Sequence, residues 1–66
     1  MNLWKVKGKM TEKQKTYRQC AKAIGVSDTT FYKKINGKTK FYYDEAIALF
    51  DYLDMNAAER NAVLFE

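Results

Sequence analysis

A chain of 66 residues with a hydrophobic fraction of 47% is expected to fold as one domain over residues 1–66. Its single cysteine excludes an internal disulfide, and the absence of histidine excludes a Ser-His or Cys-His nucleophile pair and leaves no ligand set for zinc. No signal-peptide pattern, membrane-length apolar run or glycine-rich phosphate loop occurs, so we expect a cytoplasmic protein without enzymatic activity, cofactor or metal.

Charge is distributed unevenly along this chain, whose net charge is +4. Residues 1–40 hold eleven Lys and Arg against only Glu12 and Asp28, which gives +9, whereas residues 41–66 carry −5. The pattern indicates one half that faces a polyanion and one half that avoids it. A second interpretation stays open, in which the lysines only solvate the surface.

Apolar residues recur at intervals of three and four, and no strand pattern occurs, so the sequence predicts an all-α fold of five helices. The first predicted helix runs from about Asn2 to Lys13. Its apolar face carries Leu3, Val6 and Met10. Trp4 lies beside this face and is expected to cap the core. Gly8 costs roughly 1 kcal/mol relative to Ala inside a helix, so it is expected to mark the close approach of another backbone.

The next two predicted helices are short and are separated by one tight turn. The string Thr16-Tyr17-Arg18-Gln19 matches a capping box, and the helix that it begins is expected to end at Gly25 in a left-handed conformation. Ser27 is a good N-cap for the third helix, which Asn36-Gly37 ends. A short helix, a glycine-containing turn and a second short helix together predict a helix-turn-helix over residues 16–36.

Packing between these two helices explains several residue types. Ala21 is expected to be small because the helices cross closely there, and Val26 to fill the gap beneath the turn. Phe31 and Ile35, four residues apart, are expected to anchor the third helix so that its other face projects outward. Cys20 is expected in the core, with redox sensing as the alternative.

A basic loop, Lys38-Thr39-Lys40, precedes the fourth predicted helix, which spans about Tyr43 to Leu53 with a wide apolar stripe. The fifth begins at Asn56, where Asn56-Ala57-Ala58-Glu59 resembles another capping box. Two interpretations of the apolar end stay open: Leu64-Phe65 either folds back onto the core or forms a dimer seam.

The string TYRQCAKAIGVS over residues 16–27 resembles the T-Q-x-x-L-A-x-x-x-G-V-S pattern of the phage repressor and Cro-type (XRE-like) helix-turn-helix family. The string TFYKKINGK over residues 30–38 resembles that family's recognition helix with its N-G-K ending, and residues 44–53 are similar to its fourth helix. Three departures stand out. Tyr17 replaces a usual Gln and Cys20 a usual Leu. Lys34 lies where relatives are often apolar, so that Ile35 would serve as the anchor instead and rotate the recognition helix.

The resemblance implies a compact five-helix lambda-repressor-like DNA-binding domain acting in a bacterial host. It further implies a phage or prophage Cro-like repressor that reads a pseudo-palindromic operator in double-stranded DNA through the major groove. The protein would be a weak homodimer stabilised on DNA, with no membrane association. Two alternatives stay open: an antirepressor-like protein-interaction module on the same fold, and a toxin–antitoxin regulator, which would need a toxin-binding tail.

The resemblance also assigns the contacts. Base edges would be contacted by Asp28, Thr29, Tyr32 and Lys33. Lys33 suits guanine O6 and N7, Asp28 suits cytosine N4, and Thr29 offers a hydroxyl and a methyl group. In the alternative, Asp28 only stabilises its helix dipole and Tyr32 packs or stays in solvent. Phosphates would be contacted by Thr16, Tyr17, Ser27, Thr30, Lys38, Thr39 and Lys40. For the two loop lysines, a solvated turn is the alternative.

Overall fold

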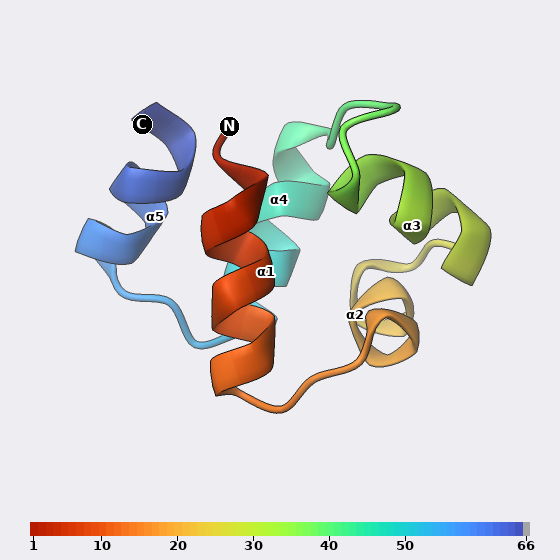
Figure 1. Cartoon of the computed structure of the whole chain (residues 1–66), viewed down its shortest axis with the longest axis horizontal. Helices are drawn as coiled ribbons and strands as arrows, with labels where there is room; N and C mark the ends of the chain where they lie inside the picture. The colour runs from red at the N-terminus through yellow and green to blue at the C-terminus, as the bar shows by residue number, and fades with distance from the viewer. Residues whose placement is uncertain (66) are drawn as a thin grey trace.

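A computed structural model describes residues 1–65, which form five α-helices and no β-strand (Figure 1). The helices are α1 (Leu3–Glu12), α2 (Tyr17–Ile24), α3 (Asp28–Ile35), α4 (Tyr43–Tyr52) and α5 (Ala57–Phe65). The all-α class and all five predicted helices are confirmed. No helix among these residues is long and apolar enough to cross a membrane.

Reciprocal polar caps set the beginnings of α2 and α5. Thr16 Oγ1 accepts the Gln19 N–H at 3.1 Å, and Gln19 Oε1 accepts the Thr16 N–H at 2.8 Å. Asn56 and Glu59 exchange the same two bonds, each at 2.9 Å. Both predicted capping boxes are therefore confirmed, and each satisfies backbone N–H groups that the helix itself leaves unpaired.

The turn between α2 and α3 depends on one glycine. Gly25 has a φ of +77°, a left-handed conformation that costs a residue with a Cβ free energy. The next N–H, that of Val26, bonds back to the Ala21 carbonyl at 3.0 Å. Ser27 then caps α3 by accepting the Thr30 N–H at 3.1 Å. The chain thus leaves one helix and enters the next within three residues, as predicted.

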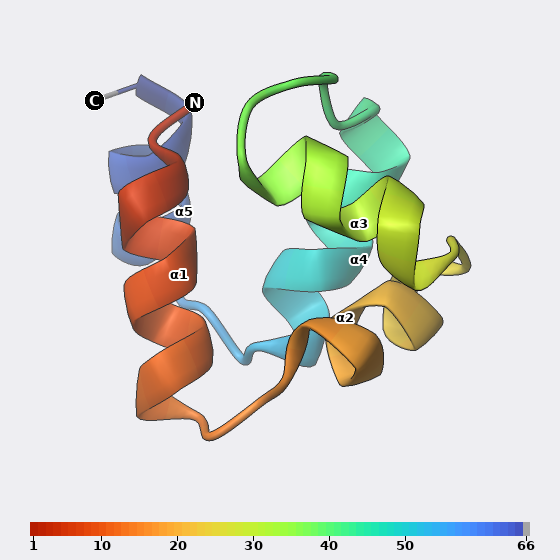
Figure 2. The ribbon, with the colours of Figure 1, turned by 45° about the vertical axis from the view of Figure 1, so that its right-hand side comes forward.

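The helices lie in two groups, with α1 and α5 at one end of the molecule and α2, α3 and α4 at the other (Figure 1). In Figure 1, α2 is seen nearly end on while α3 runs across the view, so these two helices cross steeply. Helices α1 and α5 lie side by side with the beginning of α1 close to the end of α5, and the Asn2 N–H donates to the Val63 carbonyl at 2.6 Å (Figure 2). Helix α4 packs against α2 and completes the end that carries α3.

All five helices contribute to one apolar core. Its largest fully buried side chains are Phe31, Phe50, Ile35, Leu49, Leu53, Val6, Val63 and Cys20. Ala21 is also fully buried, as the close crossing of α2 and α3 requires, and Val26 packs against the core from the turn. Burial raises the pKa of the Cys20 thiol above its ordinary value of 9.0, so the thiol stays protonated at neutral pH.

Two expectations about α1 are wrong. Trp4 is 80% exposed and does not cap the core. The buried face of α1 carries Val6 and Met10, and Trp4 lies off that face because each residue turns the helix by about 100°. At Gly8, apart from its chain neighbours and the backbone of its own helix, no atom lies within 4 Å of the position that a Cβ would take, so no backbone of another element approaches it.

The two apolar residues at the end of α5 differ in whether they fold back onto the core. Leu64 is half-buried and packs against the core, which matches the interpretation in which this end folds back. Phe65 is 81% exposed and does not fold back. Its ring is therefore left on the surface.

Candidate nucleic-acid interface

Helix α3 has one buried and one exposed face. Its buried face carries Phe31, Lys34 and Ile35. The four residues expected to contact bases, Asp28, Thr29, Tyr32 and Lys33, are all exposed. They follow the i, i+1, i+4, i+5 spacing that places residues on one side of a helix. The structure therefore brings the four predicted base-contact residues together on a single outward surface, which we call the α3 face.

The expectation that Ile35 anchors α3 is confirmed, but the expectation that it does so in place of Lys34 is wrong. Both side chains are buried, since Lys34 is 6% exposed and Ile35 is 0% exposed. Ile35 is thus buried in addition to Lys34 and does not take its place. Burial of a lysine requires partners for its charge. Lys34 has them, because its ammonium lies 2.9 Å from a carboxylate oxygen of Glu45.

The beginning of α2 lies beside the first turn of α3. The residues that line the shallow depression between them are Thr16, Tyr17, Arg18, Asp28, Thr29 and Tyr32. The ring of Tyr17 packs at a tilt against Phe31 and Tyr32, with centroid separations of 5.7 Å and 6.3 Å. Two of the residues expected to contact phosphate, Thr16 and Tyr17, thus border the α3 face at its N-terminal end.

The hydroxyl groups near this end already have intramolecular bonds. Thr16 Oγ1 and Ser27 Oγ each accept a backbone N–H as helix caps. Ser27 Oγ also donates to Thr30 Oγ1 at 2.9 Å, so its single proton is already bonded. Among the three hydroxyls, those of Thr16 and Thr30 still have a proton to donate to a phosphate, whereas the proton of Ser27 is used in its bond to Thr30.

The basic loop borders the α3 face at its other end. Within it, the Lys38 N–H donates to the Lys33 carbonyl at 2.9 Å and the Thr39 N–H to the same oxygen at 3.4 Å. Lys38, Thr39 and Lys40 are all exposed. Within residues 1–65, no ion pair occupies the ammonium groups of Lys33, Lys38 or Lys40. Three unpaired cations therefore lie at or beside the C-terminal end of α3.

Arg18 is a residue of this surface that the sequence analysis did not assign. Its Nε lies 3.4 Å from Asp28 Oδ2, and both side chains are well exposed, at 85% and 61%. An ion pair so exposed adds little stability. Its effect here is electrostatic, since it offsets the one negative charge of the α3 face. Ten residues separate the partners, and only the turn at Gly25 brings them together.

No group of three or more His, Cys, Asp or Glu side chains within residues 1–65 is placed to hold a metal ion. Glu45, Asp51 and Glu59 of α4 and α5 each pair with a cation, as in the contact of 2.7 Å between Asp51 and Arg60.

The fold and this surface define a five-helix all-α protein with a steeply crossed pair of short helices and an exposed, cation-bordered face on the second. The chain belongs to the family described as "Protein of unknown function (DUF739)", which it matches over residues 1–66. No curated protein and no solved structure matches the chain.

Proposed function

We propose that this protein is a sequence-specific double-stranded DNA-binding transcriptional regulator of the phage repressor and Cro kind. The observation that carries the proposal is the α3 face. It is exposed along its whole length, bordered at one end by Thr16 and Tyr17 and at the other by the basic loop. An exposed helix fits the major groove, and cations or hydroxyls on either side of it suit the phosphates that flank the groove.

We propose further that the protein acts as a homodimer on a pseudo-palindromic operator. A single small module buries only about 600–1,000 Å² of protein surface on DNA, which limits its affinity. Two copies on half-sites one helical turn apart double that contact. Binding at an operator would then exclude polymerase.

A binding selection from random duplexes, followed by titrations across salt concentrations, tests this function. We expect an enriched site with two-fold symmetry, bound far more tightly than random DNA. Salt-sensitive binding without any enriched sequence would leave a basic surface but no specific regulator.

Replacing Lys40 by Ala is expected to weaken binding to enriched and random duplexes alike. One lost phosphate contact lowers the slope of log K against log salt by about one unit. Matched titrations of the two proteins measure this slope. Lys13→Ala is the control, because it removes the same charge at the end of α1 opposite the basic loop (Figures 1 and 2). An unchanged slope for Lys40→Ala would remove this residue from the phosphate contacts.

An antirepressor-like interaction module is the second candidate. Exposed aromatic side chains outside the α3 face favour it: Trp4, Tyr43 and Phe65 are 80%, 77% and 81% exposed. Large exposed apolar side chains are typical of protein interfaces when they gather in a patch. A selection that enriches no DNA, together with a stoichiometric protein partner recovered from a nucleic-acid-free lysate, would favour this candidate.

A further inference from the structure

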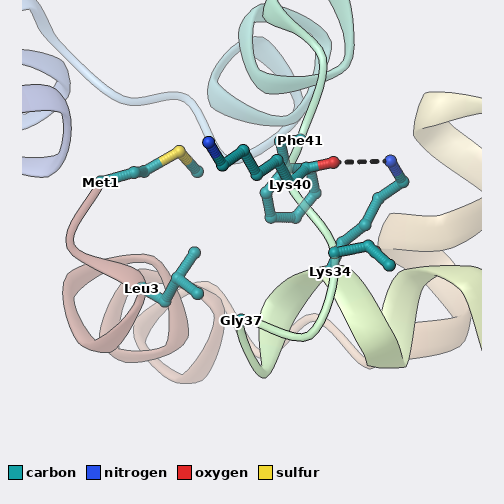
Figure 3. Close-up of a pocket in the computed structure, with 7 residues that line it drawn as sticks. Met1, Leu3, Lys34, Gly37, Lys40 and Phe41 are labelled. Atoms are coloured by element: carbon teal, nitrogen blue, oxygen red, sulfur yellow. Dashed lines mark hydrogen bonds between the residues drawn. The ribbon is translucent and has the colours of Figure 1, made fainter.

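Lys34 is the charged residue at the centre of the contact between α3, the basic loop and α4. Its side chain is 7% exposed, and its ammonium forms an ion pair of 2.9 Å with Glu45. The same ammonium donates to the backbone carbonyl of Lys40 at 2.9 Å, the bond drawn in Figure 3. One side chain of α3 therefore holds both the end of the loop and the first turn of α4.

The surroundings of this ammonium satisfy a charge that burial would otherwise penalise. It lies 4.6 Å from the ring centroid of Tyr42 and 6.0 Å from that of Phe41, within reach of both π faces. Glu45 also accepts the Tyr42 N–H at 2.9 Å. Burial alone would raise the pKa of Glu45, but this N–H and the ammonium hold it below its ordinary 4.5, so the carboxylate is ionised at neutral pH.

A lysine is not needed here for packing alone. Methionine fills a similar unbranched volume, and well-packed apolar residues often replace buried ion pairs without loss of stability. The bond to the Lys40 carbonyl is what no apolar side chain could supply. This bond joins Lys34 to the basic loop at Lys40, whose own side chain is proposed to contact a phosphate.

The basic loop is thus tied to α3 at two points. At its beginning, the N–H groups of Lys38 and Thr39 bond to the Lys33 carbonyl. At its end, the Lys40 carbonyl bonds to the Lys34 ammonium. Side chains on a loop fixed in this way lose less conformational freedom when they bind, which favours affinity.

We propose that Lys34 is a positioning residue, which touches no DNA and sets affinity by holding Lys38 and Lys40 where they meet phosphates. The proposal rests on the proposed DNA-binding function and adds to it a buried determinant of that binding. It predicts that the loop cations and the Lys34 side chain act as one unit. Their effects on DNA binding should therefore not add.

The test compares proteins in a Glu45→Gln background. This substitution removes the negative charge but keeps an oxygen that can accept the Tyr42 N–H, and it leaves the bond from Lys34 to the Lys40 carbonyl in place. Glu45→Gln alone is the matched control, and Lys34→Met in the same background removes the bond to the loop. Far-UV circular dichroism and thermal unfolding first identify a temperature at which every variant is folded.

Binding of one duplex, the enriched site, is then titrated across salt for both variants and for each combined with Lys40→Ala. We expect Lys34→Met to lower the salt slope by about one to two units, since one or two phosphate contacts are lost. Lys40→Ala should then lower it little further, whereas in the control it should remove about one unit. A full Lys40→Ala effect in both backgrounds would overturn the positioning role.

Amide hydrogen exchange in the free protein gives a second measurement that needs no DNA. In the Lys34→Met variant, the N–H groups of Lys38 and Thr39 should exchange faster while those in the middle of α3 keep their protection. Unchanged loop exchange would overturn the proposal even if affinity fell. If the wild-type protein binds no duplex, the proposed function fails; if it binds and the slope is unaffected by Lys34→Met, only this inference fails.

Discussion

Replacing Phe31 by Ala is expected to lower the free energy of unfolding by about 3–5 kcal/mol, the usual cost of removing a buried aromatic side chain. Phe31 is fully buried on α3, and its ring packs against Tyr17 and Phe41 at centroid separations of 5.7 Å and 6.0 Å. Small domains have little stability to spare, since even larger ones reach only about 5–15 kcal/mol. Urea unfolding followed by far-UV circular dichroism should therefore find this variant largely unfolded at room temperature.

The matched control for this variant is Phe65→Ala. The Phe65 ring is 81% exposed, so its loss should change the free energy of unfolding by no more than about 0.5 kcal/mol. A Phe31→Ala protein that unfolds at nearly the wild-type urea concentration would show that another contact holds α3 in place. Because both substitutions replace Phe by Ala, any difference in the free energy of unfolding comes from the position of the residue and not from its type.

The helices could be predicted because their signals are local. Periodic apolar residues and the two capping boxes at Thr16 and Asn56 lie within one or two turns of sequence, and the structure confirms both boxes. Gly25 was predictable for the same reason, since a left-handed residue ends a helix wherever the helix packs.

The errors concern which side of a helix meets the rest of the chain. Trp4 is the largest apolar residue of α1 and was expected to be covered, yet its side chain is 80% exposed. Lys34 shows the opposite case. Its burial depends on Glu45, eleven residues later, and on a loop carbonyl, neither of which a periodicity pattern can reveal.

Most of the candidate site was predictable from the sequence, but one ion pair on its surface was not. Once Phe31 and Ile35 were recognised as the buried pair of α3, helical geometry placed the four outward residues together. The pairing of Arg18 with Asp28 was not predictable, because it arises from the crossing of α2 and α3. Because Arg18 already offsets the negative charge of Asp28, the pairing favours the interpretation in which Asp28 does not contact a base. Lys33 is therefore the stronger candidate for base recognition.

Replacing Lys33 by Ala is expected to relax the choice of base at one position of each half-site. A lysine that donates to guanine O6 and N7 discriminates against other bases by about 1–3 kcal/mol, and alanine at this position offers no donor. Lys33 is exposed on the α3 face and forms no ion pair within residues 1–65, so its ammonium is available to a base edge. Titrations of the enriched site and of its single-base replacements measure the discrimination.

The same titrations on random DNA distinguish a base-specific contact from sequence-independent electrostatic binding. A base contact should cost more on the enriched site than on random duplex, and the loss should be confined to one base pair of each half-site. Lys13→Ala, which removes a charge far from the basic loop, should leave the preference at every position as it was. Equal losses on both kinds of DNA would make Lys33 another phosphate contact, and base recognition would then have to come from Thr29 and Tyr32.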